Sequence, residues 1–238
     1  MFSPLIYVFF ATTLIYLSFF TLNTIFSAKE KFFLKNLFGI LQGSFLIASL
    51  ILFLIHALPE SKNLFKISLI SVVFSLAGFF LSHYCTSNTK KITGNILILL
   101  GTLVYLQILY PSFKLFKVSS FAFISSIIVY ILLGFFYILL ILKHRSLKKE
   151  LLNLQMIFIL LKTIFGCVCN FAGIITIIYD HTLYSLLFFL GMTLLVLSFL
   201  FEIAFKLKES SKKCPFLYEL FFNLSLLFNS AGVIVMLI

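Results

Sequence analysis

Three ionisable side chains, Lys162, Glu202 and Glu219, fall inside long apolar stretches of this sequence. A charge at membrane depth is costly, so residues of this kind are candidates for function. Lys162 lies near the middle of its stretch, whereas Glu202 and Glu219 lie about one helical turn from the two ends that flank a single basic loop. His83 ends another apolar stretch on the same predicted side of the membrane. We therefore expect these four groups to converge at one end of a helical bundle.

Two interpretations of these groups stay open. In the first, Glu202 and Glu219 lie at the membrane interface and balance the lysines of the loop between them, while Lys162 extends its stem to Glu202 and forms a buried pair. In the second, Lys162, Glu202 and Glu219 line a polar cavity that opens to the cytoplasm and binds the head group of an amphiphile. The two carboxylates would then serve as acid and base. Coupling to an ion or a proton is a third use of the same residues.

Other catalytic patterns are missing from the sequence. It contains no HExxH, no metal-ligand spacing, no GxSxG and no Walker loop. Cys167 and Cys169 are two residues apart, so on a helix they would point about 200° away from each other and could not share a metal ion. We therefore predict neither a metal site nor a cofactor.

The elements that position these residues follow from the composition. Of the 238 residues, 62% are hydrophobic and only 11% are charged, against about 45–50% and about 25% in soluble domains. Such a chain cannot cover a water-facing surface, which indicates a polytopic membrane protein. The net charge of +11 comes from short basic runs between apolar stretches, as in cytoplasmic loops, and this distribution argues against a nucleic-acid partner.

Charged runs and turn signals divide the chain into eight stretches long enough to cross a bilayer. We predict an all-α fold, a bundle of eight transmembrane helices that forms one integral membrane domain over residues 1–238. A turn at Asp180–His181 separates the sixth helix from the seventh. The predicted helices are Pro4–Ser27, Leu37–Leu58, Ile67–His83, Gly94–Tyr110, Val118–Leu142, Leu151–Tyr179, Thr182–Phe205 and Phe216–Ile238.

The orientation follows from the basic residues. Most of the 18 Lys and Arg residues fall in the loops after the first, third, fifth and seventh predicted helices. Because positive charge marks the cytoplasmic side, we predict that both termini are extracytoplasmic. No targeting signal is evident, and an inner or plasma membrane is the expected location.

Four segments resemble the YhhN-like membrane proteins, whose characterised members are lysoplasmalogenases. Phe33–Asn36 corresponds to a Lys-Pro of that family, and Phe74–Gly78 to its Ser-Leu-x-Gly-Asp. Gly94–Tyr105 is similar to the glycine-led helix that follows, and Gly191–Ser198 to a late Gly…Ser-Asp segment. The resemblance spans most of the chain in register.

This resemblance implies an eight-helix bundle that hydrolyses the vinyl-ether bond of a lysolipid. Phe79 and Phe199 stand where the family has aspartates, and Thr102 stands where it has a histidine. The reaction needs a proton donor and a base that activates water. Glu202, one turn beyond Ser198, is the acid nearest to either motif.

Three functions are consistent with these observations. The first is a lysolipid-acting enzyme with Glu202 and Glu219 as acid and base, and with Lys35, Lys162 and His83 binding the substrate. The second is a small transporter or lipid-handling protein that uses the same cavity without cleaving a bond. The third is a non-catalytic partner in a larger membrane-protein complex. Membrane lipids are the expected partners in each case.

Overall fold

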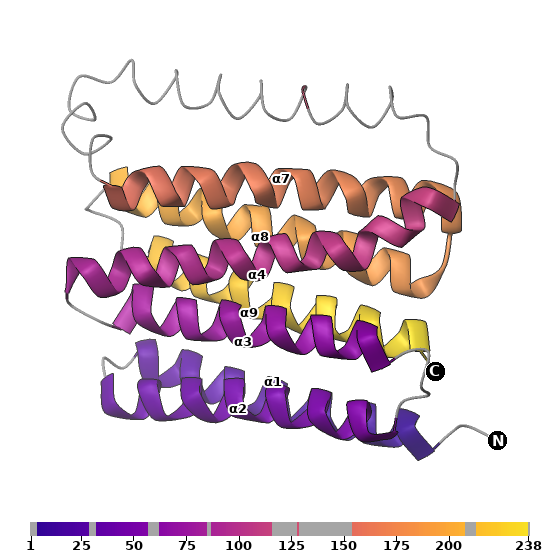
Figure 1. The fold of residues 1–238 in the computed structure, drawn as a ribbon. Coiled ribbons are helices and arrows are strands. Elements are labelled where there is room, and N and C mark those ends of the chain that lie inside the picture. Colours follow the sequence, from indigo (N-terminus) through magenta and orange to yellow (C-terminus); the bar gives the residue numbers. More distant parts are fainter. Residues whose placement is uncertain are drawn as a thin grey trace.

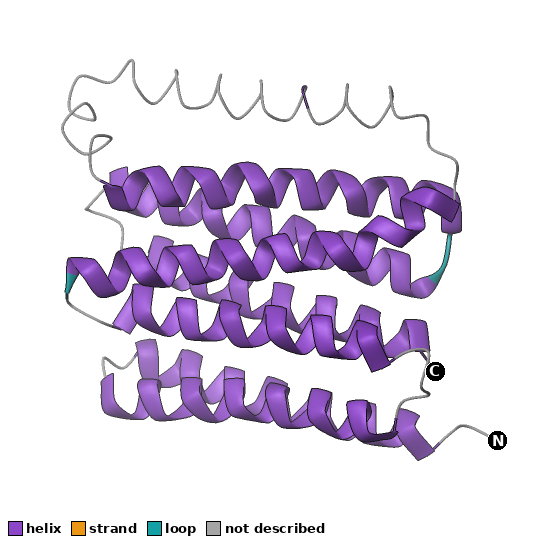
Figure 2. Ribbon diagram, in the orientation of Figure 1, coloured by secondary structure: helices purple, strands orange, loops and turns teal. Residues whose placement is uncertain are grey.

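The computed structural model describes residues 4–28, 32–56, 62–84, 87–115, 128, 154–207 and 213–237. Within these residues, only Ser87, His181 and Thr182 are not helical (Figure 2). The long helices lie side by side in a bundle (Figure 1). The all-α fold class is confirmed for this part of the chain. The helices are α1 (Pro4–Ala28), α2 (Phe32–His56), α3 (Lys62–Tyr84), α4 (Asn88–Leu115), α7 (Leu154–Asp180), α8 (Leu183–Leu207) and α9 (Lys213–Leu237).

Five of these helices are long and apolar enough to cross a membrane, which agrees with an integral membrane protein. A shorter apolar stretch, Ala11–Asn23, lies in α1. The prediction of eight spans stays a prediction, because neither α1 nor α4 is among these five and Val118–Leu142 lies outside the described residues except for Ile128. The five spans are Phe33–Ile55, Lys62–Tyr84, Leu154–Ile178, Leu183–Ala204 and Phe216–Val235.

Several helices extend beyond the predicted apolar stretches. Helix α2 begins at Phe32 rather than Leu37, α3 begins at Lys62 rather than Ile67, and α4 covers Asn88–Leu115 rather than Gly94–Tyr110. Backbone hydrogen bonding continues where apolar residues give way to lysines, because a long lysine stem can lie along the helix while its ammonium group reaches water. This correction places Lys35 on a helix.

The turn predicted at Asp180–His181 is confirmed. Helix α7 ends at Asp180, and His181 has a φ of 48°, the left-handed conformation that often terminates a helix. Thr182 and Ser185 then cap the next helix reciprocally, since each backbone N–H donates to the other's hydroxyl, at 3.2 and 3.4 Å. This short connection brings α7 and α8 side by side.

Helices α3 and α4 make one of the closest contacts in the bundle. A Cβ atom placed on Gly78 would lie 2.5 Å from the carbonyl oxygen of Gly94, and the Ser71 hydroxyl donates to the Gly101 carbonyl at 2.6 Å. Small residues let backbones approach in this way. Ser71 and Gly78 of α3 therefore belong to a packing seam against α4.

The first turn of α1 and the last turn of α9 lie at the same end of the bundle (Figure 1). This placement agrees with termini on one side of a membrane. Which side they face stays a prediction.

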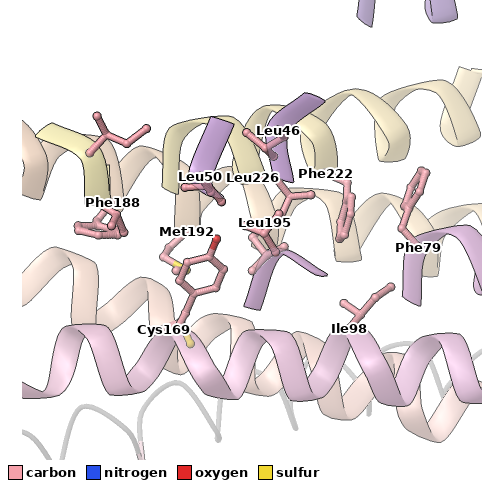
Figure 3. Packing of buried hydrophobic residues seen from close by; sticks show 14 of the residues in the cluster. Leu46, Leu50, Phe79, Ile98, Cys169, Phe188, Met192, Leu195, Phe222 and Leu226 are labelled. Atoms are coloured by element: carbon pink, nitrogen blue, oxygen red, sulfur yellow. The ribbon is translucent and has the colours of Figure 1, made fainter. Parts of the chain in front are cut away.

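Helices α1 and α2 form a hairpin that reaches the rest of the bundle through α3 and α9. The buried Tyr16 hydroxyl of α1 donates to the Asn223 carbonyl of α9 at 3.0 Å. Apolar side chains from α2, α3, α4, α7, α8 and α9 fill the centre (Figure 3). Those labelled there are Leu46, Leu50, Phe79, Ile98, Cys169, Phe188, Met192, Leu195, Phe222 and Leu226.

Candidate functional site

The candidate site lies at the end of the bundle opposite to the first turn of α1 (Figure 1). Lys35 lies in the first turn of α2, His83 in the last turn of α3, and Glu219 in the second turn of α9. Because α2 and α3 run in opposite directions and α9 runs parallel to α2, the three side chains meet at one level.

Glu219 is the centre of this cluster. Its Oε1 atom lies 2.6 Å from Lys35 Nζ and 2.5 Å from His83 Nε2. The side chains of Lys35, His83 and Glu219 are 11%, 20% and 8% exposed. The carboxylate is thus largely removed from solvent, while the histidine keeps a partly accessible edge.

Aromatic rings surround Lys35 and His83, the two partners of Glu219. The His83 ring stacks on Phe79 with centroids 5.4 Å apart, and the Tyr84 ring lies edge-on to it. Lys35 Nζ lies 5.5 Å from the centroid of the Tyr84 ring, a favourable position for a cation. These contacts fix the direction of the imidazole and of the ammonium group.

A second ion pair lies deeper in the bundle. Lys162 Nζ of α7 lies 2.5 Å from Glu202 Oε2 of α8 and donates to Asn95 Oδ1 of α4 at 2.6 Å. The ammonium group also lies 5.0 Å from the Phe199 ring centroid. The lysine is fully buried, so these contacts join three helices around an ammonium group that has no exposed surface.

Tyr218 lies between the two groups. Its ring centroid is 5.8 Å from Lys162 Nζ and 5.8 Å from the centroid of the His83 ring. Tyr218 also interacts electrostatically with Glu202 and Glu219. Four of the five residues predicted for the site, His83, Lys162, Glu202 and Glu219, therefore lie around this tyrosine, and Lys35 joins them through Glu219.

The structure bears on the first of the two interpretations from sequence, and the polar cavity of the second stays a prediction. The buried pair of Lys162 with Glu202 is present. Glu202 and Glu219 are each only 6% exposed, so neither carboxylate is freely solvated, while their position relative to the membrane interface stays a prediction. Glu219 reaches Lys35 and His83 on neighbouring helices, since its helix is packed against α3.

Sequence reasoning missed several members of the site. Tyr218 precedes Glu219, and Asn95 follows the glycine that contacts α3. Asn23 and Gln42 are buried amides in the first hairpin. The available signal was the position of each polar side chain within an apolar stretch, where an unpaired amide is costly.

The contact of Glu219 with His83 can support proton transfer. When one imidazole nitrogen donates to a carboxylate, the tautomer is fixed and the other nitrogen can accept or deliver a proton. The Lys162–Glu202 pair lies deeper, and both of its side chains are less exposed than the His83 ring. Within the described residues, no group of three or more His, Cys, Asp and Glu could hold a metal ion.

A cavity of about 260 Å³ adjoins the Glu219 cluster. It is bounded by α1, α2, α3 and α9, and its wall includes Phe79 and Tyr84, the same rings that contact His83 and Lys35. The rings of Phe79 and Tyr84 therefore contact the cluster on one side and line the cavity on the other.

No family model, no curated protein and no solved structure matches this chain. The resemblance to the YhhN-like proteins stays an expectation from the residues quoted above.

Proposed function

We propose that this chain is a multi-pass membrane protein that acts on a lysolipid by hydrolysing its vinyl ether. The observation that carries the proposal is the contact of the Glu219 carboxylate with His83 and Lys35. This contact brings an imidazole and an ammonium group to one carboxylate at one end of an apolar bundle, which supports the proposal. This is the arrangement that an amphiphile with an anionic head and an apolar chain requires.

His83 is the proposed acid and base. Its imidazolium form delivers a proton to the vinyl carbon remote from the ether oxygen, which leaves a positive charge shared between the other vinyl carbon and that oxygen. Water adds to this carbon, and the neutral imidazole takes the proton that the water loses. The imidazolium then protonates the former ether oxygen of the resulting hemiacetal, the neutral imidazole takes the hydroxyl proton, and the bond between that oxygen and the hemiacetal carbon breaks to release an aldehyde and a glycerophospho head group. Glu219 contacts one ring nitrogen and orients the imidazole.

Lys35 is the proposed contact for the lysolipid phosphate. One of its N–H groups donates to Glu219, and an ammonium group has two more to offer. The acid–base role predicted for Glu202 and the phosphate-binding role predicted for Lys162 stay predictions. Their mutual contact at 2.5 Å and the full burial of the lysine favour a structural role for the pair.

The test is aldehyde release from a lysoplasmalogen by the purified full chain in lipid nanodiscs. We expect release by the parent protein and a loss of at least 100-fold in His83→Gln and Glu219→Gln, in the range typical of acid–base groups. A lysolipid with an ester in place of the vinyl ether is the control substrate. Full activity in His83→Gln would refute the mechanism.

A second candidate is lipid binding or transport without cleavage. The ion pairs favour this candidate. Each glutamate is already paired with a lysine, and a carboxylate held in an ion pair is less available as an acid or a base. Such a protein would bind or move the lysolipid in liposomes and release no aldehyde. A non-catalytic subunit would instead co-purify with other membrane proteins.

A further inference from the structure

The wall of the cavity between α1, α2, α3 and α9 combines apolar side chains with buried amides. Most of its wall is apolar and none of its lining residues is charged, yet it includes the amides of Asn23, Gln42 and Asn223. Asn23 and Gln42 are 5% and 1% exposed. Amides buried at this depth need hydrogen-bond partners.

The protein satisfies these amides only in part. Neither Asn23 Oδ1 nor either amide atom of Gln42 makes a hydrogen bond of ordinary geometry. Gln42 faces the Tyr16 hydroxyl, but that hydroxyl already donates its one proton to the Asn223 carbonyl. The Gln42 carbonyl oxygen, which belongs to a residue of the cavity wall, is therefore left without a donor.

The rim of the cavity is apolar and exposed. Ile40 of α2 and Val73 and Phe80 of α3 line it, and each has more than a third of its surface exposed. Both helices contain apolar spans, so side chains exposed along them face the hydrocarbon of a bilayer. A ligand would thus enter sideways between α2 and α3.

We propose that this cavity binds the hydroxyl-bearing, uncharged part of a membrane lipid, with the apolar chain lying along Ile40, Val73 and Phe80. A hydroxyl both donates and accepts, so it suits an amide in either orientation. A carboxylate would bring an unpaired charge into a wall that has none. The proposal does not depend on bond cleavage at His83.

The test uses a monoacylglycerol with a photoactivatable diazirine in its chain and the full-length protein in nanodiscs. We expect cross-links to peptides of α2 and α3. In Gln42→Leu, the apparent affinity should fall about tenfold, as expected for the loss of one to two hydrogen bonds. The melting temperature of that variant should rise, since a buried amide is removed.

Two further variants make the experiment decisive. Asn170→Leu on α7 is the matched control, because it removes an amide that bonds Thr193 instead, and it should keep the parent affinity. Gly39→Ala would place a methyl group 3.3 Å from the Tyr84 hydroxyl and 3.5 Å from Asn23 Nδ2, and it should also weaken binding.

Three results would overturn the proposal. They are equal binding of a probe whose hydroxyls are methylated, unchanged affinity in both Gln42→Leu and Gly39→Ala, and cross-links confined to helices other than α2 and α3. Glu219→Gln separates this proposal from the proposed hydrolysis, since that variant should lose aldehyde release and still bind the probe.

Discussion

Lys162 Nζ and Glu202 Oε2 lie 2.5 Å apart, and the lysine side chain has no exposed surface. Removing one partner of such a pair leaves a buried charge without compensation. We therefore expect Lys162→Met and Glu202→Leu each to destabilise the protein by about 3–5 kcal/mol, measured by unfolding in detergent.

The double variant Lys162→Met/Glu202→Leu is the control for this pair. Replacing both charges with apolar groups of similar volume removes the desolvation cost as well as the attraction. We expect its stability to return to within about 1–3 kcal/mol of the parent, because Asn95 Oδ1 still loses the donor that Lys162 supplies. Additive losses in the double variant would show that the two residues act independently.

Gly94→Ala should separate helices α3 and α4. The added methyl carbon would lie 2.5 Å from the Ser82 backbone nitrogen and 2.6 Å from the Gly78 carbonyl oxygen, and neither atom can move without its helix. A cost of about 1–3 kcal/mol is expected. In Gly43→Ala the methyl would meet only the Leu76 side chain, at 3.4 Å, so the melting temperatures of the two variants should differ clearly.

Lys35→Met should affect substrate binding more than turnover. In the proposed function, Lys35 holds the phosphate of the lysolipid, and a charge-assisted hydrogen bond of this kind contributes about 1.5–3 kcal/mol. The KM for lysoplasmalogen should rise about tenfold or more, while kcat changes by less than about threefold. A fall in kcat with an unchanged KM would instead place Lys35 in the chemical step.

Ser87 and His181 provide a test of orientation, because both are exposed and lie in turns at opposite ends of the bundle (Figure 2). In a cysteine-free background, a membrane-impermeant maleimide should label His181→Cys in intact cells. It should label Ser87→Cys only after permeabilisation, because positive charge near Ser87 predicts a cytoplasmic position. The reverse pattern would invert the predicted topology and place Glu219 on the outer side.

The sequence predicts where the helices lie along the chain more readily than it predicts which helices pack against each other. Length and hydropathy suffice for the apolar stretches, and the break at Asp180–His181 follows from two polar residues between long apolar runs. Helix ends are less predictable, because residues such as Lys35 and Lys62 continue a helix beyond its apolar part.

Only one of the two charge pairs could be predicted from the sequence. Lys162 and Glu202 lie on consecutive described helices, and a long stem near a carboxylate predicts their contact. The contact of Lys35 with Glu219 joins residues 184 positions apart and depends on how α2 packs near α9, for which no periodicity or spacing gives a signal. The cavity beside Asn23 and Gln42 is likewise a product of packing.

The bond from Tyr16 to the Asn223 carbonyl has a consequence for biosynthesis. A ribosome makes the α1–α2 hairpin first and α9 much later, yet Glu219 and Asn223 of α9 complete both the charge cluster and the cavity. Until α9 inserts, the first hairpin has neither its hydrogen-bond acceptor nor its counter-ion. A nascent chain halted before residue 213 would therefore present Lys35 and Gln42 to lipid or to a chaperone of the insertion machinery.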